Sequence, residues 1–180
     1  MKTYSQAGQD IFVRLILGEK PGTFLDIGCA GDVFSNTKAL EEEGWTGWLI
    51  DVDPNAAKGR KNPFFQMDVR QGHIVPPFDP DYLSLDVDEA SLSALLNIPL
   101  KQIHFKVITI EHDAYRFGNA LREGERASLM SLGYQLVCKD VCATAGNPFE
   151  DWWVDPAHAA QAAKFASQGK LYTDILAGYL

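Results

Sequence analysis

Two aspartates and two glycines have the residue types and the spacing to hold a cofactor. Asp26 stands near the tip of the apolar run 23–27, and Gly28 and Gly31 follow it. Asp51 ends the next apolar run, at a separation typical of a βαβ unit. A carboxylate placed there lies beside the glycine turn and can accept hydrogen bonds from both hydroxyls of a ribose. The pattern therefore predicts a site for a cofactor that contains a nucleoside.

The charge of Asp26 separates the possible cofactors. A dinucleotide site attracts a pyrophosphate through backbone N–H groups and a helix N-terminus, and a carboxylate at the strand tip would repel that ligand. The same carboxylate suits an ammonium group, and the glycines let the ligand lie against the backbone. S-adenosylmethionine (SAM) carries an ammonium, a sulfonium and no phosphate. We therefore expect SAM, with an NAD-dependent oxidoreductase as the less favoured alternative, and we expect Asp68 to meet the adenine amino group.

Acidic and imidazole side chains at two later strand ends could act on an acceptor. Asp86 and Asp88 follow one apolar run, and Glu111 and His112 close another. Such folds bind ligands at the carboxyl ends of strands, so these groups would open into one cleft if the strands are neighbours. In one hypothesis His112 or Asp86 takes the proton of an acceptor hydroxyl while the sulfonium methyl group is transferred. In the other, the four side chains hold a hard divalent cation. We favour the base and predict no metal, because spacing across two strands cannot establish ligand geometry.

The elements that must position these residues alternate between strands and helices. Strands are predicted at 23–27, 48–51, 64–67, 81–86, 105–111, 134–141 and 150–154. Helices are predicted at 5–17 with Ser5 as the N-cap, at 35–44, after Pro54, at 91–96, at 119–131 and from Pro156 onwards. A short link between the last two strands predicts a hairpin. The expected fold is a single Rossmann-like domain over residues 1–180, a three-layer α/β/α sandwich of the class I methyltransferase type. Its sheet is expected to be mostly parallel and seven-stranded, with one antiparallel strand.

Composition and charge limit the partners. The chain has 180 residues, 46% of them hydrophobic and 22% charged, which suits one ordinary globular domain. Its formal net charge of −8 argues against a nucleic-acid partner or an anionic membrane surface and leaves small neutral or cationic acceptors open. Three cysteines without a CxxC pair, and no secretory leader at the start, predict free thiols in a reducing compartment. We therefore expect a cytoplasmic protein.

Several motifs, taken in order, resemble the FkbM-type family of SAM-dependent methyltransferases. They are Tyr4-Ser-Gln-Ala-Gly-Gln-Asp10, Phe24-Leu-Asp-Ile-Gly28, Ser35-Asn-Thr37, Gly44-Trp45 with Gly47, Ile50-Asp51, Asp81-Tyr-Leu-Ser-Leu-Asp86, Ile110-Glu-His112, Gly133-Tyr134 and Phe149-Glu-Asp-Trp152. The resemblance implies a Rossmann-like fold and methyl transfer, commonly to a hydroxyl oxygen of a sugar or a secondary metabolite. It leads us to expect an O-methyltransferase for a small hydroxylated acceptor such as a saccharide.

The resemblance also implies roles for particular side chains. The cofactor residues would be Asp26, Gly28 and Asp51. The mouth of the site would be lined by Ser5, Gln6, Gln9 and Asp10, and the reaction cleft by Asp86, Glu111 and His112. The family usually has a Glu-Gly-x-Glu pattern after the fourth strand, whereas Ser91 stands here where the second acid is expected. The glycine turn is also one residue shorter than in the family, with Gly31-Asp32 in place of the usual Asp-Gly order. These two departures keep open the alternative of a non-catalytic cofactor-binding or interaction module with the same fold.

Overall fold

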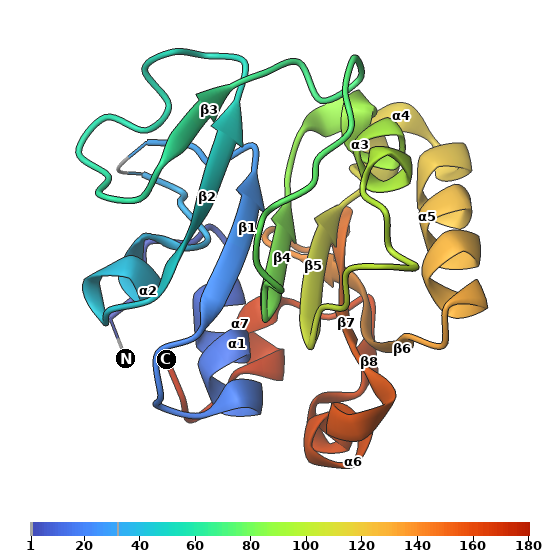
Figure 1. Ribbon diagram of the computed structural model, residues 1–180. Coiled ribbons are helices and arrows are strands. Elements are labelled where there is room, and N and C mark those ends of the chain that lie inside the picture. The colour runs from blue at the N-terminus through green and yellow to red at the C-terminus, as the bar shows by residue number, and fades with distance from the viewer. Residues whose placement is uncertain (1, 32) are drawn as a thin grey trace.

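The chain folds around one sheet with helices on both faces (Figure 1). The structure is a computed structural model that describes residues 2–31 and 33–180. The strands are β1 (Thr23–Ile27), β2 (Thr46–Asp51), β3 (Phe64–Gln66), β4 (Tyr82–Leu85), β5 (Val107–Glu111), β6 (Gln135–Cys142), β7 (Pro148–Val154) and β8 (Ser167–Gln168). The α-helices are α1 (Gln9–Leu17), α2 (Lys38–Glu42), α3 (Ser91–Asn97), α4 (Ala114–Phe117), α5 (Asn119–Ser131), α6 (Ala159–Ala162) and α7 (Tyr172–Ile175). Short 3₁₀ helices are η1 (Asp88–Ala90), η2 (Pro156–His158) and η3 (Ala163–Phe165).

The strand order confirms the predicted type of sheet. The order is β3-β2-β1-β4-β5-β7-β6-β8, and β1 pairs in parallel with both β2 and β4. Only β7 runs against its neighbours in the described sheet, since it is antiparallel to β5 and to β6 while β6 and β8 are parallel. The hairpin between β6 and β7 produces this reversal, as the short link between them predicted. The carboxyl ends of β1, β2, β4 and β5 consequently meet at one edge of the sheet (Figure 1).

Successive side chains of a strand point to opposite faces of the sheet. Both faces of this sheet are buried, because the side chains on each face pack in an apolar core. In β1, Phe24 packs in the core on the α1 side, whereas Leu25 packs in the core formed with α3 and α5. In β7, Trp152 stacks on Phe12 of α1 with ring centroids 4.8 Å apart, and Trp153 joins the opposite core. These two cores lie between the sheet and the helices on its two faces, which gives the three layers of the predicted sandwich.

The C-terminal segment differs from its prediction, because an eighth strand replaces part of the expected helix. The Ala-rich segment forms η2, α6 and η3, and then β8 pairs in parallel with β6 through Cys138 and Ser167. The Gly169 N–H group also donates to Lys139 O at 2.9 Å. Hydrogen bonding to the exposed edge of β6 therefore outweighs the helix propensity of this stretch.

Two predicted helix boundaries also change, and the helix predicted after Pro54 does not form. Helix α1 begins at Gln9, after Gly8 with φ 73°, so Ser5 is not its N-cap. Helix α2 begins at Lys38, although Ser35 Oγ does accept a hydrogen bond from the Lys38 N–H group at 3.2 Å. After Pro54 the chain makes successive turns with hydrogen bonds between residues three apart, and it forms no α-helix there.

Helix length bears on the membrane question. The longest helix in the described ranges, α5, has 13 residues, whereas crossing a bilayer takes about 20. Accordingly, no helix within residues 2–31 and 33–180 is long and apolar enough to span a membrane. The cysteines Cys29, Cys138 and Cys142 are all free and buried, which agrees with the predicted free thiols.

Candidate functional site

The turn after β1 requires a glycine at position 28. Gly28 has φ +80°, and a Cβ atom there would lie 1.6 Å from the backbone oxygen of Asp86. The approach is this close because the strands remain hydrogen-bonded at the turn. The Asp86 N–H group donates to Ile27 O at 2.9 Å, and the Gly28 N–H group donates to Ile50 O at 2.8 Å. Any side chain at position 28 would therefore push apart the ends of β1 and β4.

A hollow of about 280 Å³ opens at the carboxyl ends of β1 to β4, and we call it the strand-end hollow. It is lined by Gly28, Asp51, Val52, Met67, Asp68, Val69, Arg70, Asp86, Val87, Asp88, Glu89 and Ala90. The hollow brings together five residues that the sequence singled out in four separate segments, namely Gly28, Asp51, Asp68, and Asp86 with Asp88. The parallel topology makes this convergence, since the strand ends share one edge of the sheet.

Two acids of the strand-end hollow are oriented by local hydrogen bonds. Asp51 Oδ1 accepts from the Asp53 N–H group at 2.9 Å. Asp68 accepts two hydrogen bonds of 2.9 Å from the Arg70 guanidinium, one at each oxygen. These bonds lower the pKa of Asp68 to about 2. Asp68 is therefore a carboxylate throughout the physiological pH range and can only accept hydrogen bonds, as contact with an amino group requires.

A second hollow, of about 70 Å³, involves Gln6, and we call it the N-terminal hollow. It is lined by Gln6, Glu111, Asp113, Tyr115, Ala143, Thr144, Asn147 and Phe149. These residues come from the start of the chain, the end of β5, and the hairpin between β6 and β7. Among the described lining residues there is no lysine or arginine, so the hollow is polar with an acidic wall.

Each hollow contributes one member of a pair of carboxyl groups. Asp86 lines the strand-end hollow, Glu111 lines the N-terminal hollow, and their side chains share a hydrogen bond. Burial raises the pKa of Glu111, and the hydrogen bond with Asp86 and its charge raise that pKa further. Burial raises the pKa of Asp86 as well. Two carboxyl groups share a hydrogen bond only when one of them is protonated, so the pair holds a proton at neutral pH.

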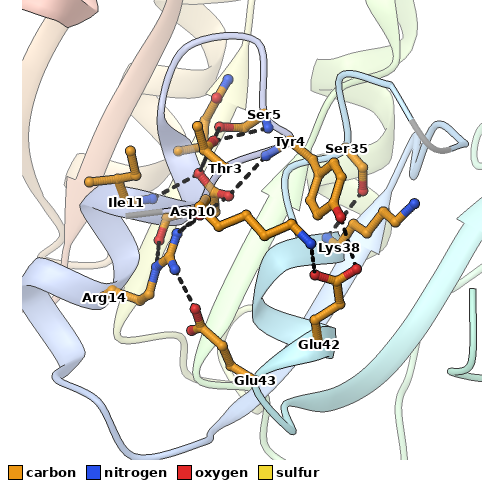
Figure 2. A network of polar contacts seen from close by, with 12 residues as sticks. Thr3, Tyr4, Ser5, Asp10, Ile11, Arg14, Ser35, Lys38, Glu42 and Glu43 are labelled. Carbon is orange, nitrogen blue, oxygen red and sulfur yellow. Dashed lines mark hydrogen bonds and ion pairs between the residues drawn. The ribbon is translucent and has the colours of Figure 1, made fainter. Parts of the chain in front are cut away.

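Asp10 anchors the segment that carries Gln6 (Figure 2). The Asp10 side chain is fully buried and accepts hydrogen bonds from Thr3 Oγ1 at 2.7 Å and Ser5 Oγ at 2.8 Å. The Arg14 guanidinium adds a bond of 3.1 Å to the backbone oxygen of Asp10. The start of the chain is thereby tied to α1, which fixes the position of Gln6.

Five residues expected at the cofactor or at the mouth of the site lie outside the linings of both hollows, namely Ser5, Gln9, Asp10, Asp26 and Gly31. Ser5, through its bond to Asp10, supports the segment that holds Gln6. Gly31 has no left-handed backbone conformation, and a Cβ there would meet only Ala56 O, at 3.8 Å. The structure thus requires glycine at Gly28 and not at Gly31.

The structure separates His112 from the Asp86–Glu111 pair, which corrects the expected single cleft. Glu111 and His112 are consecutive at the end of a strand, so their side chains point to opposite faces. His112 is fully buried, and its Nδ1 accepts from the Ala114 N–H group at 3.1 Å. The neutral ring therefore carries its proton on Nε2, which lies 3.6 Å from Asp151 Oδ1. Neither ring nitrogen is placed to take a proton from an acceptor in the hollows.

The hard-cation alternative finds two other sets of residues. Possible ligand atoms of His112, Asp140 and Asp151 lie within 4.8 Å of one another, and so do carboxylate oxygens of Asp88, Glu111 and Asp113. Arg116 Nη1 already bridges two of these acids, donating to Asp88 Oδ1 at 2.7 Å and to Asp113 Oδ2 at 2.9 Å. A guanidinium thus supplies positive charge at the second set, and at the first set Arg126 donates to Asp140 and to Asp151. The choice between base and cation stays a prediction.

Ser91, which replaces an expected acid, faces the packing between two helices. Its side chain is fully buried at the start of α3 and donates a hydrogen bond to Glu125 of α5. Burial raises the pKa of Glu125 to about 7. A second carboxyl at position 91 would meet this acid. The departure therefore concerns the contact between α3 and α5, and neither hollow is altered by it.

A buried network holds Asp26 below the turn. Asp26 is 1% exposed, and its Oδ2 accepts from Thr37 Oγ1, which in turn accepts from Arg60 Nη2 at 2.7 Å. Asp26 Oδ1 has no hydrogen-bond partner among the described residues. Burial raises the pKa of Asp26 to about 6, although the Arg60 charge opposes that rise. Sequence reasoning missed Arg60, because a residue in an irregular turn carries no periodic signal.

Sequence reasoning also left Glu150 out of the candidate site. Glu150 pairs with Glu111 across β7 and β5, and it accepts hydrogen bonds from Gln9 Nε2 at 2.6 Å and from Trp152 Nε1. Burial raises the pKa of Glu150 to about 8. The motif Phe149-Glu-Asp-Trp152 was visible in the sequence, but only strand pairing places its glutamate beside Glu111.

The strand order, with its one reversed strand, defines the chain as having the class I methyltransferase fold. Similar folds occur in the magnesium protoporphyrin IX methyltransferase of Synechocystis PCC 6803 with bound SAM, at TM-score 0.59 and 16% identity over 83% of this chain and 79% of that one. A TehB-like SAM-dependent methyltransferase from Corynebacterium glutamicum matches at TM-score 0.54 and 20% identity, over 80% and 86%. A SAM-dependent methyltransferase from Clostridium acetobutylicum matches at TM-score 0.55 and 10% identity, over 86% and 92%.

Comparisons of the sequence with known families and proteins do not identify a family for this chain. No protein-family model matches the chain, and no curated protein sequence matches it. The resemblance to the FkbM-type family therefore stays a prediction.

Proposed function

We propose that this protein is a SAM-dependent methyltransferase that binds SAM in the strand-end hollow and methylates a hydroxyl group of a small acceptor. The observation that carries the proposal is the meeting of Gly28, Asp51, Asp68 and Asp86 in one hollow. The fold is shared with proteins described as SAM-dependent methyltransferases. The residues of the strand-end hollow and the shared fold together support a cofactor with an adenosine moiety at the carboxyl ends of the strands.

The residues fit SAM in charge. Gly28 lines the strand-end hollow, and the position that a Cβ would take there is occupied by the backbone oxygen of Asp86. Asp26 Oδ1 is a buried oxygen without a donor among the described residues, and an ammonium group supplies donors. Asp51 and Asp68 offer acceptors for ribose hydroxyls and for an adenine amino group, respectively. When bound, SAM supplies a methyl group on a positively charged sulfur, which acidic surroundings stabilise.

The Asp86–Glu111 pair is the proposed site of proton handling. Asp86 lines the strand-end hollow and Glu111 lines the N-terminal hollow, so in this proposal an acceptor in the N-terminal hollow presents its hydroxyl to the pair. One carboxyl of the pair holds a proton, and the other, being a carboxylate, can take the proton of the acceptor. His112 is not proposed as the base, because its side chain lies on the face of the sheet that α5 covers.

The lining of the N-terminal hollow suits a neutral hydroxylated acceptor such as a saccharide. Gln6, Tyr115, Thr144 and Asn147 offer donors and acceptors for hydroxyl groups. Asp113 is already paired with Arg116, but the whole chain carries a net charge of −8. A phosphate-bearing acceptor would therefore be repelled at this entrance, whereas a neutral or cationic one would not.

The proposal is tested by calorimetric titration of the protein with SAM, S-adenosylhomocysteine and NAD. We expect micromolar binding of the first two ligands and none of NAD, followed by methyl transfer to a saccharide in a radiolabel screen. Binding of NAD alone would favour the oxidoreductase alternative. Binding of none of the three would overturn the proposal and favour the interaction module.

A further inference from the structure

Arg60 is a buried arginine that no proposed role has yet used. It lies in the turns between β2 and β3, and its side chain is 0% exposed. The guanidinium donates to Ser35 Oγ at 2.9 Å, to Glu41 Oε2 at 3.2 Å and to Cys29 O at 3.5 Å. It therefore joins the turn after β1 to α2 and to the segment before it. Burying a guanidinium is costly unless its donors are satisfied, and these partners satisfy them.

The same guanidinium acts on Asp26 directly and through Thr37. It lies 3.9 Å from Asp26 Oδ2, and its Nη2 donates to Thr37 Oγ1 at 2.7 Å. Because Thr37 Oγ1 accepts from Arg60, the threonine proton is free to point at Asp26 Oδ2, and this bond is present. The chain of hydrogen bonds from Arg60 through Thr37 therefore ends at Asp26 Oδ2. Asp26 Oδ1 is the carboxylate oxygen without a partner among the described residues.

We infer that Arg60 is a positioning residue that holds the Asp26 carboxylate as the partner of the ammonium group of SAM. The inference rests on the proposed function. Only the ionised form of Asp26 attracts an ammonium, and only a fixed Oδ2 leaves Oδ1 available. Arg60 serves both needs, since its charge favours the carboxylate and its bond to Thr37 fixes the orientation.

Other groups near Asp26 oppose ionisation, which makes the arginine necessary. Burial raises the pKa of Asp26 to about 6, and the charge of Asp86 after β4 raises it too, while the Arg60 charge and the hydroxyl groups of Thr37 and Ser84 lower it. Tyr82 and Cys29, the remaining titratable neighbours, have raised pKa values and stay neutral at pH 7. Arg60 is thus the positive charge that faces Asp26 in the described structure.

The experiment compares two ligands that differ in the ammonium group. S-adenosylhomocysteine carries the amino-acid part, whereas 5′-methylthioadenosine keeps the adenosine and lacks it. Calorimetry would measure both with wild type, Arg60→Met, Arg60→Lys and the control Lys106→Met, which removes an ion pair with Asp81 at the far end of the sheet. We expect Arg60→Met to weaken S-adenosylhomocysteine about tenfold at pH 7, because each pH unit below a carboxyl pKa cuts its ionised fraction about tenfold. Affinity for 5′-methylthioadenosine should stay within about twofold, and Arg60→Lys should restore most of the loss.

A second readout needs no ligand. Carbon-detected NMR titration of the Asp26 carboxyl should give a midpoint near pH 6 in the wild type and a higher midpoint in Arg60→Met. The midpoints in Arg60→Lys and Lys106→Met should be close to that of the wild type. Equal loss of both ligands in Arg60→Met, or an unchanged Asp26 midpoint, would overturn the inference. If Arg60→Met does not fold, the Arg60→Lys variant and the pH dependence of wild-type binding test the inference instead. The affinity for S-adenosylhomocysteine should fall below pH 6, while the affinity for 5′-methylthioadenosine should not. An equal fall for both ligands would refute the role of Asp26. Failure of the wild type to bind either ligand would refute the proposed function, while the NMR midpoints would still test the pairing of Arg60 with Asp26.

Discussion

Replacing Gly28 by alanine tests the geometry on which the candidate site depends. The new Cβ would lie 1.6 Å from Asp86 O and 2.9 Å from Val87 Cγ1, and the backbone at φ +80° disfavours any side chain. The left-handed conformation costs about 1–2 kcal/mol, and forcing apart two packed strand ends adds about 1–3 kcal/mol. We expect a loss of about 3 kcal/mol in the free energy of unfolding, or roughly 10 °C in melting temperature for a domain of this size.

Gly118→Ala is the matched control. Gly118 has φ +78°, and a Cβ added there would meet nothing within 4 Å, so its variant bears the conformational cost without the clash. Urea denaturation of both variants would separate the two terms, and Gly28→Ala should be less stable than Gly118→Ala by about 2 kcal/mol. Because Asp86 O borders the strand-end hollow, Gly28→Ala should also bind S-adenosylhomocysteine at least about tenfold more weakly than Gly118→Ala. Equal stability and equal affinity of the two variants would refute the close contact between β1 and β4.

Three further variants test separate parts of the site. Asp51→Ala should weaken S-adenosylhomocysteine about tenfold to a hundredfold by removing a charged acceptor for the ribose, as calorimetry would show, and unchanged affinity would remove Asp51 from the site. His112→Asn should lower stability to urea by about 1–3 kcal/mol and leave cofactor affinity unaltered, since His112 contacts the buried Asp151 and neither hollow; a variant of normal stability that has lost turnover would restore His112 to catalysis. Glu111→Gln should change the pH dependence of stability: the raised pKa of Glu111 means that the folded protein holds a proton that the unfolded chain releases, so the wild type loses up to about 1.4 kcal/mol per pH unit from pH 5 upwards through this group. The glutamine cannot titrate and can donate to Asp86, so urea midpoints between pH 5 and 8 should fall less steeply, and an identical slope would disprove the shared proton.

The sequence by itself determined the order of elements and the residues at most strand ends. The apolar run of β1, the glycine after it and the acids that end β2 and β4 could be identified without coordinates. The reason is that strand ends and tight turns have strong local requirements, namely β-branched or apolar runs, glycine at positive φ, and polar residues where a strand leaves the core. The reversal of β7 was predictable for the same reason, since a link too short for a crossover permits only a hairpin.

Tertiary structure decided which of those residues share a site. Glu111 and His112 are neighbours in sequence, but the alternation of a strand sends the first to the hollows and the second to α5. Conversely, Asp86 and Glu111 come from different strands and meet because β4 and β5 pair in parallel. The roles of Arg60 and Glu150 also depend on contacts between distant segments, since Arg60 reaches Asp26 from an irregular turn and Glu150 reaches Glu111 across a sheet. Such contacts are set by packing and strand pairing, and local sequence carries no signal of either.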